Sequence, residues 1–443
     1  MFSRRIINCV FVVLLACGAQ AAFGDDYVLV TSPSKVTDVC GRHSLTQVTN
    51  GVSSGGNGVY LVSSSSADSS IPTDSDIVSF EPNRKLGVPE LSSLSTQLTQ
   101  STGVIIDQLP GRAAVSYFGA AVANYYVSQK ATALVQLGRL QNSTTVNGQG
   151  ITVAVIDTGV DPSHPALANV ITGGFDFTRN QQGASELLDL SGPLQAALSQ
   201  STGVIIDGQN VVLVNPSTAA ILTQSVSSTL GQMPEAFGHG TMTAGLIHLI
   251  APGARIMPLK AFNADGTSEV FNIVRAIMYA ADNGANVISM SFEIPQSSPA
   301  LQNAIQYALS KNVVLVASSG NDGQQTMVYP AGYNGVIGVA STTSLDGKSV
   351  FTNFGTNAAF VAAPGEAVIT TYPDGNYAAG WGTSFSAPLV AGEAALILQA
   401  RPTYKPGDVA NAVSRAVQVP QLGHGRIDLC LSISSIGAGL QCQ

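Results

Sequence analysis

Three residues in separate glycine-rich contexts could together turn a serine hydroxyl into a nucleophile. Ser384 lies in Gly-Thr-Ser-Phe-Ser-Ala-Pro, His239 in Gly-His-Gly-Thr and Asp157 in Val-Ile-Asp-Thr-Gly. A hydroxyl is a poor nucleophile at neutral pH, so it needs a base to accept its proton and a carboxylate to hold that base in the right tautomer. The three side chains therefore predict acyl transfer through a covalent serine intermediate.

A fourth motif lies between His239 and Ser384 in the sequence. Asn321 lies in Ser-Ser-Gly-Asn-Asp-Gly, which follows the apolar run 313–316. A buried strand is therefore expected to end just before Asn321, with its end facing the nucleophile.

The four motifs, in the order Asp, His, Asn, Ser, resemble those of the subtilisin-like serine proteases, over roughly residues 120–428. The resemblance implies that Asp157, His239 and Ser384 are a catalytic triad. It also implies that the amide of Asn321, with the backbone N–H of Ser384, binds the oxyanion. No cofactor is implied for this chemistry.

The resemblance further implies a substrate-binding segment at Ser291, Phe292 and Glu293, where the family has Ser-Leu-Gly. Glu293 adds bulk and charge where the substrate backbone would pass, so either the local backbone differs or the specificity is unusual. One hypothesis is that its carboxylate favours basic side chains. Ala166 stands where many subtilisins have an aspartate ligand for calcium, so no metal site is predicted there, while a weaker calcium site elsewhere stays open.

The expected elements would bring these residues to one edge of a sheet. Strands are predicted at residues 151–156, 255–262, 286–290, 313–317 and 336–340, and helices at 269–282, 299–310 and 384–399. Buried strands separated by helices predict an α/β fold, a mostly parallel twisted sheet with helices on both faces. Such sheets bind ligands at the carboxyl ends of their strands, where Asp157 and Asn321 lie.

The extreme N-terminus has the pattern of a secretory signal peptide over residues 1–24. Two arginines at 4–5 precede an apolar run at 6–16 and a small-residue cleavage site at 19–21. The run is shorter than the ~20 apolar residues that a transmembrane helix needs. A lipoprotein signal ending at Cys17 and a twin-arginine signal remain alternatives.

Residues 25–122 are predicted to form a propeptide ahead of a catalytic domain at 123–443. Short β-like runs occur at 27–30 and 58–62, and the segment 76–83 resembles the last strand of a subtilase inhibitory propeptide. We therefore expect a small α+β propeptide domain that assists folding and inhibits the enzyme until it is cleaved off.

An insertion is expected at about residues 183–233, because 82 residues separate Asp157 from His239 (239 minus 157), more than is usual in the family. The eight residues at 100–107 recur unchanged at 200–207. The two copies either pair edge to edge and hold a zymogen shut, or represent a duplicated surface loop.

The amino-acid composition limits the functions that this chain could have. The chain has 443 residues, 45% of them hydrophobic, which is enough for a substantial core. Only 10% are charged and the net charge is −8, which argues against nucleic acid, since binding phosphates needs clustered Lys and Arg. Cys430 and Cys442 could close a disulfide in an oxidising compartment or remain free thiols.

These features predict a secreted, extracellular or periplasmic serine endopeptidase, a monomer made as a self-processing zymogen. Its expected partners are protein or peptide substrates and its own propeptide. Two other functions stay open. One is a catalytically impaired peptide-binding protein on the same fold, occluded at Glu293 or by the insertion. The other is a transpeptidase, which passes the acyl group to an amine and not to water.

Overall fold

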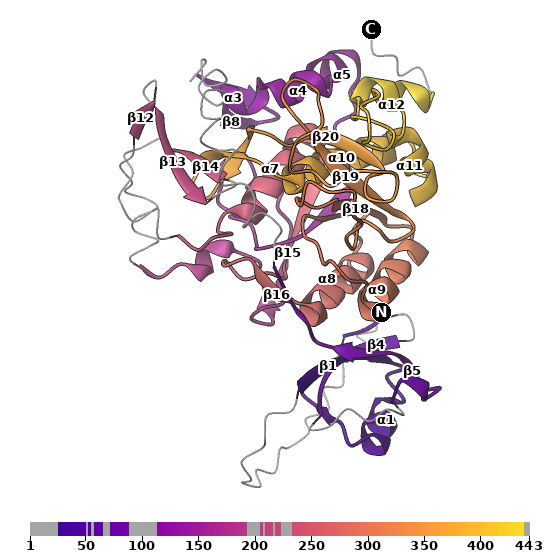
Figure 1. Cartoon of the computed structure of the whole chain (residues 1–443). Coiled ribbons are helices and arrows are strands. Elements are labelled where there is room, and N and C mark those ends of the chain that lie inside the picture. The colour runs from indigo at the N-terminus through magenta and orange to yellow at the C-terminus, as the bar shows by residue number, and fades with distance from the viewer. Residues whose placement is uncertain are drawn as a thin grey trace, which may run out of the picture.

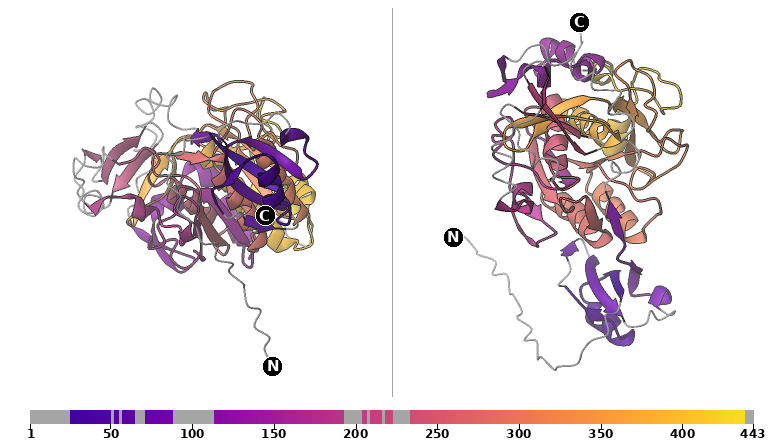
Figure 2. Two further views of the ribbon diagram at one scale, coloured as in Figure 1. Left: turned by 90° about the horizontal axis from the view of Figure 1, so that it is seen from below. Right: turned by 60° about the vertical axis from the view of Figure 1, so that its left-hand side comes forward.

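The computed structural model describes residues 25–49, 52–54, 57–64, 71–87, 113–192, 204–206, 209–215, 218–222 and 233–437. A small N-terminal unit, drawn in indigo, lies below a large α/β domain in Figure 1, and the turned view on the right of Figure 2 keeps the same arrangement. Within these ranges, no helix is both long enough and apolar enough to cross a membrane.

An eight-stranded sheet forms the centre of the large domain, in the order β11-β10-β15-β9-β17-β18-β19-β20. All neighbouring strands are parallel except β10 and β11, which confirms the predicted mostly parallel sheet. The strands are β9 (Thr152–Asp157), β10 (Phe175–Asp176), β11 (Gln181–Gln182), β15 (Arg255–Lys260), β17 (Val287–Met290), β18 (Val314–Ser318), β19 (Val336–Thr342) and β20 (Val361–Pro364).

Helices cover both faces of this sheet, as predicted. The helices are α7 (His239–Ile250) and α10 (Thr383–Ala400) on one face and α8 (Val270–Asp282) and α9 (Pro299–Ser310) on the other. Side chains of β9 alternate between the two cores: Val153 and Val155 pack with α7 and α10, whereas Ala154 and Ile156 pack with α8 and α9. The continuous apolar run of this strand therefore follows from burial on both sides.

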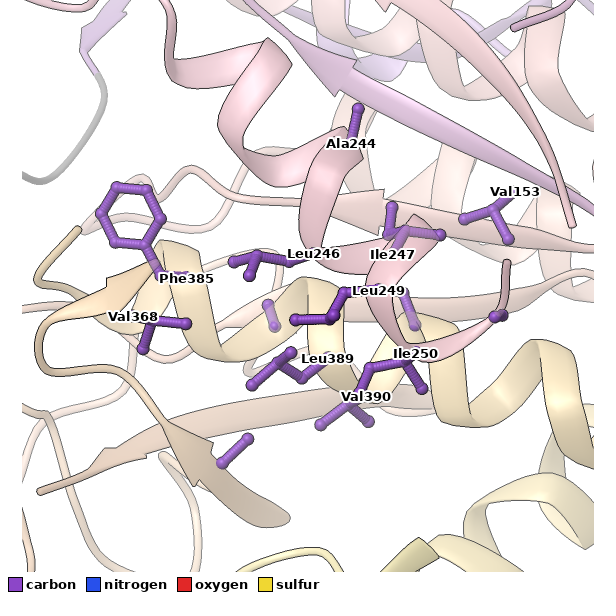
Figure 3. Packing of buried hydrophobic residues seen from close by; sticks show 14 of the residues in the cluster. Val153, Ala244, Leu246, Ile247, Leu249, Ile250, Val368, Phe385, Leu389 and Val390 are labelled. Carbon is purple, nitrogen blue, oxygen red and sulfur yellow. The ribbon is translucent and has the colours of Figure 1, made fainter. Parts of the chain in front are cut away.

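Close packing of α7 against α10 aligns the helices that begin at the predicted catalytic residues. Figure 3 shows Leu249 and Ile250 of α7 beside Leu389 and Val390 of α10. The backbones approach so closely that a Cβ added to Gly392 would lie 2.7 Å from the Cβ of Ile250. Small residues at this crossing thus set the spacing of the two helices.

The N-terminal unit is a small α+β fold, as predicted. Its antiparallel sheet has the order β2-β4-β1-β5, with β3 paired to β4. The elements are β1 (Asp25–Thr31), α1 (Val36–Arg42), β2 (Thr46–Gln47), β3 (Val52–Ser54), β4 (Asn57–Ser64), a 3₁₀ turn at Ile71–Thr73 and β5 (Ile77–Pro82). One face packs on α1, while Val28, Val30, Val59 and Leu61 of the other face share a core with α8 and α9.

Glu81, near the end of β5, and Asn83, just after it, cap these two helices. Oε1 of Glu81 accepts hydrogen bonds from Ser298 Oγ at 2.7 Å and from Ala300 N at 2.6 Å, at the start of α9. Asn83 Oδ1 accepts from Phe271 N at 3.1 Å, at the start of α8. The unit therefore satisfies N–H groups that a helix cannot satisfy internally.

The N-terminal unit ends in a strand that pairs with the large domain. Strand β6 (Lys85–Gly87) pairs antiparallel with β16 (Thr267–Glu269). After residues 88–112, which lie outside the described ranges, the hairpin β7–β8 (Ala114–Tyr117, Ala120–Ala123) packs on the core of the large domain. Tyr117 Oη donates to Leu249 O at 2.5 Å, so this hairpin is anchored to α7.

The insertion before His239 contributes to a second sheet. This five-stranded sheet has the order β12-β13-β14-β22-β21 (Figure 1). Its strands are β12 (Val204–Ile206), β13 (Gln209–Asn215), β14 (Thr218–Leu222), β21 (Val368–Tyr372) and β22 (Asn376–Gly380). The repeat copy at 100–107 and most of its counterpart at 200–207 lie outside the described residues, so edge pairing of the two copies stays a hypothesis.

Short helices complete the large domain. They are α3 (Asn124–Val127), α4 (Lys130–Leu134), α5 (Leu137–Ser143), α11 (Pro406–Val413) and α12 (Leu429–Ser435). Cys430, in the first turn of α12, is disulfide-bonded. Cys442, the partner that the sequence suggests, lies outside the described residues.

Candidate active site

The predicted triad residues lie at element ends that converge on one edge of the main sheet. Asp157 is the last residue of β9, His239 the first of α7 and Ser384 the second of α10. All three are buried, with Ser384 0%, Asp157 2% and His239 4% exposed. Carboxyl ends of parallel strands and N-termini of the following helices meet at such an edge, which explains why residues so far apart in sequence come together.

A short hydrogen bond joins the predicted acid and the predicted base. Asp157 Oδ1 lies 2.6 Å from His239 Nδ1. The same carboxylate accepts hydrogen bonds from Thr158 N at 2.7 Å and from Thr243 Oγ1 at 3.1 Å, so its orientation is fixed. With Nδ1 donating to Asp157, the other ring nitrogen, Nε2, is the one able to accept a proton.

Ser384, the predicted nucleophile, is held by reciprocal hydrogen bonds to Ser291. Ser384 Oγ donates to Ser291 O at 3.3 Å, and Ser291 Oγ donates to Ser384 O at 2.9 Å. Pro388 explains the second bond, because it lacks the N–H that would otherwise bind the carbonyl of Ser384 within α10. The His239 ring lies beside this turn, 5.6 Å between centroids from the ring of Phe385.

Asn321 is anchored to the residue that precedes the nucleophile. Its Oδ1 accepts hydrogen bonds from Thr383 N at 2.9 Å and Thr383 Oγ1 at 3.0 Å. Since an amide group is planar, fixing the oxygen also fixes the direction of Nδ2. The structure thus brings Asn321 to the first turn of α10, where the N–H of Ser384 is a second candidate donor to an oxyanion.

Phe292 and Glu293 follow Ser291 without forming a regular strand. Phe292 is buried and its ring lies 5.2 Å from that of Phe262. The carboxylate of Glu293 reaches Gly320: a Cβ added there would lie 2.1 Å from Glu293 Oε2. The bulk of Glu293 is therefore accommodated opposite a glycine, one residue before Asn321.

Comparison with known proteins identifies the family. The subtilase family model matches residues 148–426. The chain belongs to the subtilase family of serine peptidases. Thermitase of Thermoactinomyces vulgaris is 34% identical over 254 residues, which is 56% of this chain and 75% of thermitase. Subtilisin DY of Bacillus licheniformis is 37% identical over 190 residues, 40% of this chain and 69% of that protein.

A solved structure extends the similarity to the N-terminal unit. Fervidolysin from Fervidobacterium pennivorans, described as a keratinolytic enzyme related to subtilisin, aligns with 96% of this chain and 63% of its own, with a TM-score of 0.63. At 20% identity this likeness concerns the fold alone. The two proteins thus share the arrangement of a small N-terminal sheet and a large α/β domain.

One buried carboxylate of this subtilase was missed by sequence reasoning. Glu186, in the 3₁₀ turn Glu186–Asp189, is completely buried beside the triad. It accepts hydrogen bonds from Gly238 N at 2.8 Å, Thr158 Oγ1 at 3.2 Å and Thr241 N at 3.3 Å, and it contacts Thr241 Oγ1. Burial raises its pKa to about 8. Thr158 and Thr241 belong to the predicted Asp157 and His239 motifs. Nothing in the Ser-Glu-Leu-Leu-Asp segment, however, indicated a role for Glu186.

The described part of the subtilase contains no group of three or more His, Cys, Asp or Glu side chains arranged to hold a metal ion. Ala166, at the position of the calcium-ligating aspartate of many subtilisins, is 2% exposed and packs in the core beside α7. An alanine side chain has no oxygen to offer calcium, so this position contributes no side-chain ligand.

Replacing Asn321 with leucine is expected to lower the kcat of this subtilase by about 10²–10³, because the lost donor acts on charge that exists only in the transition state. The KM for a chromogenic peptide should change little, since ground-state contacts remain. Steady-state kinetics measure both constants, and the thermal unfolding midpoint checks that the variant is folded. A folded variant with an unchanged kcat would exclude Asn321 as the oxyanion donor.

Proposed function

We propose that this chain is a secreted serine endopeptidase, made as a zymogen, that cleaves peptide bonds through Asp157, His239 and Ser384. The observation that carries the proposal is the 2.6 Å hydrogen bond between Asp157 Oδ1 and His239 Nδ1, beside the helix turn that contains Ser384. An acid, a base and a hydroxyl in this relation have the parts required for nucleophilic catalysis.

In the proposed reaction, His239 Nε2 accepts the proton of Ser384 Oγ as that oxygen attacks the peptide carbonyl. Asp157 orients the ring and stabilises the imidazolium, while Asn321 and the N–H of Ser384 donate to the oxyanion. The imidazolium then gives its proton to the departing amine. Water, activated by His239, hydrolyses the acyl-enzyme and restores the serine.

The hydroxyl of Ser384 must change partner before it attacks. It donates to Ser291 O at 3.3 Å, so rotation about the Cα–Cβ bond is needed to direct it to His239. A neutral hydrogen bond of this kind contributes only about 1 kcal/mol, so exchanging it for one to His239 is energetically easy.

Fluorophosphonate labelling tests the proposal directly. The probe is expected to label the purified wild-type protein but not Ser384→Ala, because only an activated serine forms the covalent adduct. Mass spectrometry of peptide products, with and without an added amine, separates hydrolysis from transpeptidation. An unlabelled wild-type protein would favour the peptide-binding alternative, and amine adducts as the main product would favour the transpeptidase.

The N-terminal unit is proposed to inhibit the enzyme until it is removed. Its strand β6 occupies the edge of β16, and residues Arg84–Gly87 share a 560 Å³ cavity with the segment from Glu293 to Gln296. Glu293 lies two residues after Ser291, the hydrogen-bonding partner of the nucleophile. A substrate approaching along this cavity would therefore meet the N-terminal unit first.

The position of the hairpin β7–β8 bears on where maturation occurs. The sequence-based boundary at residue 122 falls inside this hairpin, which packs on α7 through Tyr117. We propose that cleavage occurs upstream, between Gly87 and Ala114, so that the hairpin stays with the mature enzyme. A mass spectrum of the secreted form measures this boundary.

Secretion is proposed from two features. The signal-like pattern of residues 1–24 is one, and the disulfide at Cys430 is the other. Disulfides persist mainly in oxidising compartments, so both features favour an extracellular or periplasmic location.

Replacing Glu81 with alanine is expected to weaken the latency of the zymogen. The change removes a carboxylate that caps α9, and hydrogen bonds to a charged group contribute about 1.5–3 kcal/mol, so inhibition should weaken about 10- to 100-fold. Peptide hydrolysis by freshly isolated full-length protein measures the effect. Asp38→Ala, an exposed acid on α1, serves as control. Equal latency in both variants would argue against inhibition through this contact.

Glu293 is proposed to give the enzyme a preference for basic side chains. Its carboxylate reaches Gly320, and it belongs to the segment from Ser291 to Glu293, which matches the stretch that lines the primary specificity pocket in the family. A lysine or arginine in this pocket would gain a charged partner that an apolar residue lacks.

Matched peptides with Lys, Leu or Glu before the scissile bond test this preference. The kcat/KM for Lys should exceed that for Leu by about tenfold or more, as expected for one charge-assisted hydrogen bond. Glu293→Gly is expected to remove the difference. Equal rates for the three peptides with the wild-type enzyme would rule the hypothesis out.

A further inference from the structure

The helix that begins with the catalytic histidine has no cap of its own. The N-cap residue of α7 is Gly238, with φ 89°, and it has no side chain to accept the first N–H groups of the helix. No larger residue fits, because a Cβ there would lie 2.3 Å from the ring of Tyr372. The N–H groups at the start of α7 are buried, so they require acceptors from elsewhere in the fold.

Glu186 supplies these acceptors from a turn 52 residues upstream of Gly238. Its Oε2 accepts from Gly238 N at 2.8 Å, and its Oε1 accepts from Thr241 N at 3.3 Å and contacts Thr241 Oγ1. These are the N–H groups of the N-cap and of the third helical residue, which an ordinary capping side chain would also bind. The start of α7, and with it His239, is thus fixed by Glu186.

The same carboxylate holds the loop after the catalytic aspartate. Glu186 Oε2 accepts from Thr158 Oγ1 at 3.2 Å. Thr158 in turn donates its N–H to Asp157 Oδ1 at 2.7 Å, and its Oγ1 accepts from Gly240 N at 3.0 Å. Glu186 therefore contacts residues adjacent to both partners of the Asp157–His239 hydrogen bond.

We propose that Glu186 is a positioning residue of the peptidase reaction, which aligns His239 with Asp157 and, when ionised, adds negative charge that stabilises the imidazolium of His239. The inference rests on the proposed function, because the imidazolium forms during that reaction. Glu186 acts through Gly238, Thr241 and Thr158, and none of its contacts is to the nucleophile.

Ionisable groups on several elements face Glu186. Asp157 of β9, Lys260 of β15 and Tyr372 of β21 interact with it electrostatically. His239 begins the helix that Glu186 caps, and Asp189 lies in the same turn as Glu186. Lys260 is fully buried and donates to Thr158 O at 2.8 Å and to Asp189 Oδ2 at 2.7 Å. Burial has the largest effect on the pKa of Glu186 and raises it to about 8. The positive charge of Lys260 lowers this pKa, whereas the negative charge of Asp157 raises it.

The sign of the pH effect follows from this pKa. Below pH 8 Glu186 is mostly protonated, and above it the carboxylate is mostly ionised. The added negative charge favours the protonated form of His239, so kcat should rise as pH increases through this range. Folding shows the opposite trend: because the pKa is raised from 4.5, this group's contribution to stability is present below pH 4.5 and is lost as pH rises through about 8.

The variant Glu186→Gln tests the proposal, since glutamine keeps the size but cannot ionise. Above pH 8, where the wild-type carboxylate is ionised, we expect kcat to fall about tenfold with KM nearly unchanged, and the ionisation step near pH 8 to vanish from the kcat profile. Glu393→Gln is the matched control: Glu393 is also fully buried with its pKa raised to about 8, but it faces Ser432 and Asp428 of the α12 region. The kcat profile of this control variant should retain the ionisation step.

A second measurement is independent of peptidase activity. The ¹H NMR signal of the proton between Asp157 and His239 should shift with pH near 8 in the wild type and in Glu393→Gln, but not in Glu186→Gln. If Glu186→Gln does not fold, Glu186→Asp should retain the shift because it still ionises. A folded Glu186→Gln with wild-type kcat and an intact step would overturn the inference, whereas a wild type without any hydrolysis would instead refute the proposed function.

Discussion

The hydrogen bond between Asp157 and His239 constrains the rest of the large domain. It joins the end of β9 to the start of α7, across 82 residues of chain. To bring Ser384 to the same point, α10 must pack along α7, and the two helices do so at a crossing that tolerates only small residues such as Gly392. The sheet, the helix packing and the buried caps can all be understood as ways of holding this one contact in position.

Local sequence patterns were sufficient to predict much of this arrangement. The triad motifs, the parallel sheet and the helices on both faces follow from short segments whose composition carries the signal. Helix α9 was predicted at its observed bounds, and the predicted strands differ from the observed ones by one or two residues at their ends. Buried strands and amphipathic helices repeat a pattern over several residues, which makes them visible without a structure.

Contacts made by single residues over long distances could not be predicted in this way. Glu186 lies in an ordinary acidic turn, and only the fold brings it under Gly238. Glu81 and Asn83 likewise cap helices that begin nearly two hundred residues or more later in the chain. The hydroxyl of Ser291 binds a carbonyl freed by Pro388, which is a consequence of backbone geometry. Each of these contacts depends on tertiary packing and leaves no periodic trace in the sequence.

The sheet that the insertion shares with β22 makes the insertion difficult to dispense with. Strand β14 pairs with β22 from Thr218 opposite Gly380 to Ile221 opposite Tyr377, and Ser384 follows four residues after Gly380. Trimming the insertion as if it were a loop would leave the backbone of β22 as an open edge, prone to pairing with another chain. A protein engineer seeking a smaller enzyme would therefore have to redesign the strand that leads into the nucleophile as well.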